Sequence, residues 1–196
     1  MTASAFPQNS HLRSCLVLAQ WSLAPGENFK KPPCQIPNPP SSSGIAAGDI
    51  VGFWKNHNPK TRTPKLIIAI YAHEDKHYGR IIGSYDTLGE LEDTIYEPQG
   101  RAKGIKGNPF YGGLDFIWNL KQKQERYRGK IIDPRNGKTY DVELWRRGDD
   151  LIVRGLLLCF GKNETWTRAE ERDFSAQFAK PDVKTFIPII PESIWK

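Results

Sequence analysis

The sequence predicts an all-β fold, an eight-stranded up-and-down barrel, from patterns that recur along residues 45–170. Apolar runs of 4–9 residues are separated by Gly, Asn and Asp, and several runs alternate apolar and polar residues with a period of two. Helical periodicity is absent from this stretch. An open meander of hairpins leaves two unpaired edges, which closure into a barrel removes. We therefore expect a closed meander.

The predicted strands follow one another in chain order, at 50–54, 66–71, 78–85, 114–120, 127–132, 140–144, 151–157 and 165–167. The run 114–120 alternates apolar and polar residues, and so do the two runs between 140 and 157. The second and third runs are apolar at consecutive positions, so their inward-facing set stays open. Alternation predicts that these residues face the barrel interior: Ile131, Tyr140, Val142, Leu144, Leu151, Val153 and Gly155.

Two connections stand out between these runs. Asn136-Gly137 is a strong hairpin signal, because both residues tolerate positive φ. The long, polar, Gly-rich stretch 86–113 is expected to lie across a mouth of the barrel or to form a wide crossover.

The segment before the barrel is rich in proline. Seven of the 15 prolines lie before residue 45, so residues 1–44 are predicted to be a disordered arm. Within it, a short apolar stretch over 13–24 ends in Ser22-x-Ala24. This stretch is either a degraded secretory signal peptide or a disordered tail with an apolar patch.

The C-terminal extension, residues 171–196, carries different signals. Thr167-x-x-Glu170 matches a capping box, and Phe174 and Phe178 are spaced for one helical face, which predicts a short helix. Residues 182–196 are extended and too apolar to remain in water, so we expect them to pack on the barrel or bind a partner.

Composition excludes several classes of protein. No apolar run approaches the ~20 residues of a membrane-spanning helix, and three cysteines are too few for a disulfide scaffold. The net charge of +6 is too dispersed to indicate nucleic acid. One local basic cluster lies beside aromatic residues and comprises Lys121, Lys123, Arg126, Arg128 and Lys130. Such a cluster can bind single-stranded nucleic acid, but we interpret it as a solvated hairpin edge, with an anionic small molecule or lipid head group as a third option.

Catalytic motifs are weak. His73-Glu74-Asp75-Lys76-His77 matches the zinc-protease pattern H-E-x-x-H, with Glu97 as a candidate third ligand. Its strand-like flanks, however, predict a hairpin tip instead of a helix. Gly137-Lys138-Thr139 resembles the end of a phosphate-binding loop, but the glycine that this motif requires five residues earlier is absent. Cys159 lies in an apolar run and is interpreted as a small core residue. We predict no enzyme activity, no metal and no cofactor.

Ordered motifs carry a family resemblance. They run from Gly52-x-Trp54 through Gly79-Arg80-Ile81, Gly107-x-Pro109, Asp133-Pro134-x-x-Gly137-Lys138-x-Tyr140 and Val153-Arg154-Gly155 to Thr165-Trp166-Thr167-Arg168. Residues 48–169 thereby resemble a bacterial family of unknown function with a lipocalin-like (calycin) barrel and mostly secreted members. The resemblance implies that Arg168 lies over Trp54 and closes one barrel end.

One departure from that family bears on location. His73 and Tyr78 stand where the resemblance implies a cysteine on each side of a hairpin, so that disulfide is absent. The mostly secreted members of the family imply a periplasmic or secreted protein, which is what we expect. The missing disulfide favours the cytoplasm, which is the alternative.

The predicted function is non-enzymatic binding of a hydrophobic or amphipathic, fatty-acid-like molecule in the barrel. The alternatives are an interaction protein with a filled barrel that binds through residues 182–196, and an enzyme of unrecognised type. The candidate ligand-binding residues are Tyr71, Tyr85, Phe110, Tyr111, Tyr127, Ile131, Tyr140, Leu144 and Val153.

Overall fold

The computed structural model describes residues 49–157 and 160–195. The predicted arm over residues 1–44, its Ser22-x-Ala24 motif and Cys159 lie outside the described residues.

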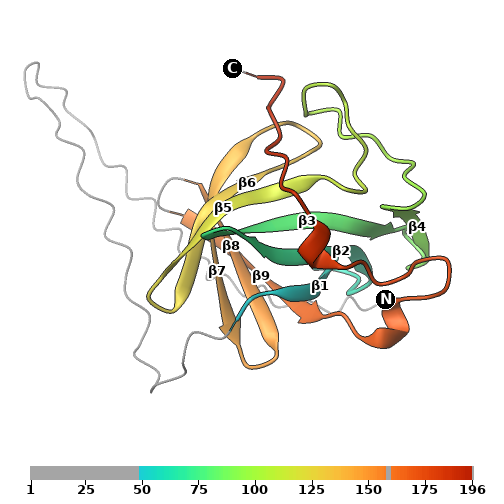
Figure 1. Cartoon of the computed structure of the whole chain (residues 1–196), viewed down its shortest axis with the longest axis horizontal. Helices are drawn as coiled ribbons and strands as arrows, with labels where there is room; N and C mark the ends of the chain where they lie inside the picture. The colour runs from blue at the N-terminus through green and yellow to red at the C-terminus, as the bar shows by residue number, and fades with distance from the viewer. Residues whose placement is uncertain (1–48, 158–159, 196) are drawn as a thin grey trace, which may run out of the picture. The chain divides into compact units, whose positions relative to one another are not determined.

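The described residues contain nine β-strands, and eight of these lie where the sequence predicts strands (Figure 1). The ninth, β4, lies in the stretch expected to be a long loop. The strands are β1 (Gly52–His57), β2 (Pro64–His73), β3 (Lys76–Tyr85), β4 (Leu91–Thr94), β5 (Asp115–Lys123), β6 (Arg126–Ile132), β7 (Thr139–Arg147), β8 (Asp150–Leu157) and β9 (Phe160–Arg168).

The strands close into an antiparallel barrel, as predicted. The sheet order is β2-β1-β9-β8-β7-β6-β5-β3-β4, and an additional β2–β3 pairing joins the two ends of the series. This leaves eight strands in the ring, with β4 attached to the last residues of β3. Closure satisfies the edge hydrogen bonds that an open meander would expose.

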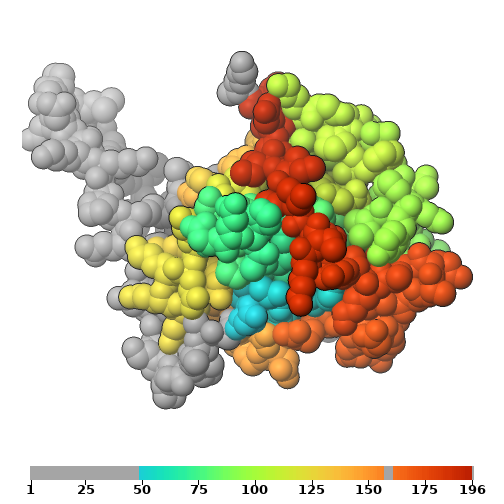
Figure 2. Space-filling model, viewed as in Figure 1, coloured from blue at the N-terminus to red at the C-terminus, as the bar shows by residue number. Residues whose placement is uncertain are grey.

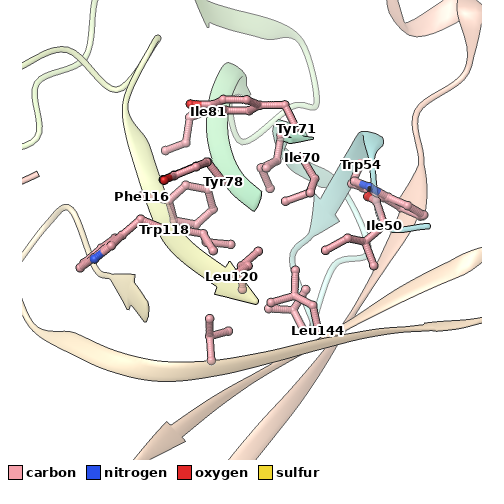
Figure 3. Close-up of a cluster of buried hydrophobic side chains, with 14 of the residues drawn as sticks. Ile50, Trp54, Ile70, Tyr71, Tyr78, Ile81, Phe116, Trp118, Leu120 and Leu144 are labelled. Carbon is pink, nitrogen blue, oxygen red and sulfur yellow. Dashed lines mark hydrogen bonds between the residues drawn. The ribbon is translucent and has the colours of Figure 1, made fainter. Parts of the chain in front are cut away.

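The two ends of the barrel differ. One end, which we call the closed end, carries the short β2–β3, β5–β6 and β7–β8 turns and residues 49–51. There Trp54 is fully buried, and its Nε1 donates a 2.9 Å hydrogen bond to the carbonyl oxygen of Ile50. Figure 3 shows these two side chains together, with Leu144 next to them. The opposite end, the open end, carries the β1–β2 loop and the β6–β7 hairpin.

A second apolar cluster lies on the outer face of β1–β3. It is centred on Ile67, Ala69, Ile82 and Phe178, and the C-terminal extension supplies its outer half. Because the extension covers this face, β2 buries side chains on both of its faces, which explains why its sequence does not alternate.

The predicted helix in the C-terminal extension is wrong in form. The extension contains two single 3-10 turns, Glu171–Asp173 and Val183–Thr185. Thr167 belongs to β9, and the capping box is formed instead by Glu170 with Asp173. Phe174 and Phe178 still stack, at 5.4 Å between ring centroids, because both anchor the extension to the outer cluster.

One local prediction also needs correction. In β5 the expected alternation is interrupted by register shifts against both neighbouring strands, and Asn119 has φ 55°. The hairpin predicted at Asn136-Gly137 is confirmed as a loop over residues 133–138, in which Gly137 adopts a positive φ of 71°. The described residues include no helix long and apolar enough to span a membrane.

Candidate binding cavity

A cavity of about 490 Å³ occupies the open end of the barrel. Its apolar wall comes from several strands, with Leu66 on β2, Ile81 on β3, Phe116 on β5, Val153 on β8 and Trp166 on β9. Phe116 and Trp166 stack within it, at 6.4 Å between ring centroids and an interplanar angle of 25°. The volume lies in the range of small-molecule sites, roughly 300–1,000 Å³.

Glycine at position 155 contributes to the space. Gly155 lines the cavity on β8, and a Cβ built there would meet no atom within 4 Å. The closed half of the barrel is filled by contrast, since Trp54, Leu120 and Leu144 are fully buried in the core. The cavity is therefore confined to the open half.

Basic side chains lie at the rim. Lys65 and Lys162 line the cavity, and neither forms an ion pair with a described residue. Arg135 also lines it but is engaged, because its Nη2 lies 2.9 Å from Oδ2 of Asp133. Hydrogen bonds from Arg135 hold the pKa of the Asp133 carboxyl below its usual value, so this pair stays ionised. The two lysines are the rim cations available to an anion.

The other polar groups of the cavity are a hydrogen-bonded carboxylate and two phenols that remain neutral. Asn56 Nδ2 donates a 2.9 Å hydrogen bond to Oε2 of Glu164 at the rim. Burial, reinforced by the charge of Asp173, raises the pKa of Tyr85 to about 12, and burial raises the pKa of Tyr111. Both hydroxyls are therefore neutral near pH 7, which leaves the wall uncharged below the rim.

Five of the predicted ligand-binding residues line this cavity: Tyr85, Tyr111, Ile131, Tyr140 and Val153. The other four do not. Leu144 and Tyr127 belong to the packed core, and the Tyr127 ring lies 5.0 Å from that of His77. Phe110 lines a separate surface groove beside the C-terminal segment, under the guanidinium of Arg101.

Tyr71 lies outside the cavity because it points to the outer face of β2. Its hydroxyl donates to Oδ1 of Asp115 at 2.9 Å, and its ring packs against Phe186 of the C-terminal extension. Asp115 also accepts from Arg80 Nε and Nη2 at 2.8 and 2.6 Å and from the backbone N–H of Ile189 at 2.8 Å. This buried cluster fastens the extension to the barrel.

Several lining residues were not among the candidates. On β9 the signal was present, since Lys162, Glu164 and Trp166 alternate and share one face. Alternation could not identify the inward residues of β2 and β3, because both strands are apolar on both faces. The lining residues missed for this reason are Lys65, Leu66 and Ile81. Gly155 on β8 was predicted to face the interior but was not among the ligand-binding candidates. The rest come from loops or the ends of strands: Asn56, Ser84, Phe116, Ile132, Asp133, Pro134 and Arg135.

The H-E-x-x-H motif forms the predicted hairpin tip. His73 and His77 lie on β2 and β3, where His73 packs on Tyr78 at the outer face and His77 packs on Tyr127 of the core. The two imidazoles thus lie on opposite faces of the wall, an arrangement unlike a helical zinc site. Among the described residues no group of three His, Cys, Asp or Glu side chains could hold a metal ion. Gly137-Lys138-Thr139 lies in the β6–β7 connection and the start of β7, away from any helix.

The basic cluster of the β5–β6 hairpin is largely paired. Lys121 pairs with Asp75, Lys130 with Asp141, and Arg126 and Arg128 both pair with Glu143. Four of its five cations thus have acidic partners. The Lys121 and Lys130 pairs are exposed, as a solvated hairpin would have them, but Glu143 is buried and its pair with Arg126 is largely shielded from solvent.

At the closed end, Arg168 and Arg146 lie over the Trp54 ring, with guanidinium carbons 4.9 and 5.0 Å from its centroid. A closed eight-stranded antiparallel barrel with this arrangement at one end and a cavity at the other defines a lipocalin-like β-barrel protein. Residues 52–168 match the family described as uncharacterized protein conserved in bacteria (DUF2147), and the chain belongs to that family.

Comparison with solved structures supports the same fold. Protein HP1028 from the human pathogen Helicobacter pylori, which belongs to the lipocalin family, matches with a TM-score of 0.53 and 21% identity. The match covers 68% of this chain and 92% of that chain, and at this identity it shows the fold alone. Comparison with curated proteins gave no match.

Proposed function

We propose that the protein binds an amphipathic anion with a hydrocarbon tail, such as a fatty acid, without transforming it. The observation that carries this proposal is the cavity of about 490 Å³ at the open end, with an apolar wall and, at its rim, two lysines that form no ion pair with a described residue. Transfer of a hydrocarbon tail from water to this apolar wall stabilises the bound state by about 0.8 kcal/mol for each buried methylene. The carboxylate stays at the solvated rim beside Lys65 and Lys162.

The direct test is titration of the purified chain with a fluorescent fatty acid, followed by displacement with unlabelled fatty acids of increasing length. We expect saturable binding with one site for each barrel. Native mass spectrometry then shows whether the bound molecule leaves unchanged, as a carrier requires. A chain that neither binds the probe nor retains any small molecule contradicts the proposal.

Position 155 offers a sharper variant. Gly155→Phe projects a ring into the cavity, where a Cβ has no neighbour within 4 Å, so it should abolish binding with little cost in stability. Thr165→Phe is the matched control, since Thr165 is exposed on β9 beside the buried, cavity-lining Trp166 and adds the same ring outside the cavity. Equal affinity in the two variants would place the ligand elsewhere.

We also propose export from the cytoplasm, on the family resemblance. N-terminal sequencing of the chain from its native cells tests this. A mature chain that starts after Ala24 supports cleavage at the Ser22-x-Ala24 motif, and an intact N-terminus in the cytoplasmic fraction contradicts it.

A further inference from the structure

Exposed large apolar side chains are concentrated in two segments of the described residues. One follows β3 and the other is the C-terminal segment, and both adjoin the open end of the barrel. The turns of the closed end carry polar and charged residues instead. The exposed residues are Leu88, Leu91 and Tyr96 in the first segment, and Ile187, Ile189, Ile190, Ile194 and Trp195 in the second.

The C-terminal segment is held in place by hydrogen bonds to backbone carbonyl oxygens. The N–H of Ile194 donates to the carbonyl oxygen of Gly104 at 3.1 Å, and Trp195 Nε1 donates to that of Asn136 at 2.9 Å. Figure 2 shows this segment, in dark red, against the yellow-green loop that precedes β5. Trp195 nevertheless remains 68% exposed. A fixed, exposed indole loses little conformational entropy when it contacts a second surface.

Two lysines lie close in sequence to the residues that hold this indole. Gly104 lies against the backbone of Gly137 so closely that neither position has room for a Cβ. Their neighbours Lys103 and Lys138 are thereby brought to the same region, both are exposed, and neither forms an ion pair with a described residue. The β6–β7 hairpin that carries Lys138 also supplies Pro134 and Arg135 to the cavity rim.

We propose that this surface docks on an anionic lipid membrane. The docking patch consists of Lys103, Lys138, Ile190, Ile194 and Trp195. Indole rings favour the boundary between head groups and acyl chains, isoleucines insert beside them, and lysines bind anionic head groups. All three residue types come from segments that are held together by the hydrogen bonds from Ile194 to Gly104 and from Trp195 to Asn136. Docking there would also bring the cavity rim close to the bilayer, where amphipathic anions reside, although membrane binding itself does not depend on the proposed ligand.

The alternative occupant, a second copy of the chain, fits less well. A twofold symmetric contact through the docking patch would bring Lys103 and Lys138 of both copies together. Four unpaired ammonium groups would then repel one another as water leaves the interface. An anionic lipid surface removes that repulsion by supplying the opposite charge.

Co-sedimentation of the full chain with vesicles tests the proposal. We expect binding to vesicles of phosphatidylcholine with phosphatidylglycerol, weak binding to phosphatidylcholine alone, and weaker but measurable binding to the anionic vesicles at high salt. Lys103→Gln and Lys138→Gln should each weaken partitioning roughly fivefold. Trp195→Ser should weaken partitioning at both low and high salt, because it removes the apolar contribution.

Lys123→Gln, at the tip of the closed end, is the matched control and should bind vesicles like the parent chain. Binding that is absent, or unchanged in the Lys103, Lys138 and Trp195 variants, overturns the proposal. A concentration-dependent dimer that Trp195→Ser dissociates, with no vesicle binding, would assign the patch to a second copy. Gly155→Phe should keep vesicle binding while losing fatty-acid binding, so the two proposals fail separately.

Discussion

Arg168 on β9 lies directly opposite Trp54 on β1 in the strand register, and its guanidinium carbon is 4.9 Å from the centroid of the indole. Arg146 lies over the same ring at 5.0 Å. Because Trp54 is fully buried and fills the closed end, it joins the first and last strands of the ring through side-chain packing as well as through backbone pairing.

We expect Trp54→Ala to cost about 3–5 kcal/mol in the free energy of unfolding, since it leaves a large void in the core. Arg168→Ala should cost about 0.5–1 kcal/mol, because Arg146 keeps one cation over the ring. Urea denaturation measures both. Lys123→Ala, at the β5–β6 turn, is the control and should leave the unfolding midpoint unchanged. Similar losses for Trp54→Ala and Arg168→Ala would contradict this account.

Charge reversal at the cavity rim should weaken ligand binding. Lys65→Glu and Lys162→Glu each replace an unpaired cation with an anion beside the expected carboxylate, so the dissociation constant should rise roughly tenfold or more, which equals about 1.4 kcal/mol. Fluorescent fatty-acid titration gives the values. A neutral long-chain alcohol should bind the parent and both variants alike, and a comparable loss for the alcohol would show that the lysines act through the fold.

The Asp115 cluster should control the order of the C-terminal segment. Asp115 is buried and accepts four hydrogen bonds, two from Arg80 and one each from Tyr71 and the Ile189 backbone. Asp115→Ala leaves the Arg80 charge unpaired, so we expect a loss of about 3–5 kcal/mol.

Hydrogen exchange resolves where this loss occurs. In Asp115→Ala the Ile189 amide should exchange faster than in the parent, before the amides of β7 and β8 do. Asp141→Ala breaks only the exposed Lys130 pair and should cost about 0–1 kcal/mol without changing exchange at Ile189. Unaltered protection at Ile189 in Asp115→Ala would show that other contacts hold the segment.

His77 should make stability depend on pH near neutrality. Burial lowers the pKa of its imidazole below the ordinary value of 6.5, and its Nδ1 has no hydrogen-bond partner among the described residues. Between the folded pKa and 6.5 the unfolded chain binds a proton that the folded chain does not, so stability falls as pH decreases through this window and is complete above it. In His77→Gln the slope of unfolding free energy against pH between 7 and 5.5 should decrease. An identical slope in both chains would contradict the assignment.

The sequence alone predicted the barrel because most of its strands have one polar face. Tyr140, Val142 and Leu144 alternate with Asp141 and Glu143, and the structure buries Val142 and Leu144 in the core. Turn residues located the hairpins within a few positions. Three of the five candidates that line the cavity, Ile131, Tyr140 and Val153, follow from the same pattern, since a period of two places alternate residues of β6, β7 and β8 on the inner face.

Alternation predicts which side chains face the interior, but it does not predict where along the barrel axis each of them lies. Leu144 and Tyr140 share one face of β7, yet Leu144 is packed in the closed half and Tyr140 lines the cavity. Tyr71 likewise looked like an interior residue, because an apolar strand does not reveal which of its faces the C-terminal extension covers.

The sequence by itself determined the strand order, the hairpins and the pairing of Trp54 with Arg168, because these follow from short-range patterns and from family motifs. Tertiary structure decided that one half of the barrel is filled and the other hollow, that Asp115 fastens the C-terminal segment, and that Gly104 and Gly137 meet close to the residues that bind Trp195. Each of these depends on contacts between residues far apart in the chain, whose side-chain volumes and charges meet only after the ring of strands has closed.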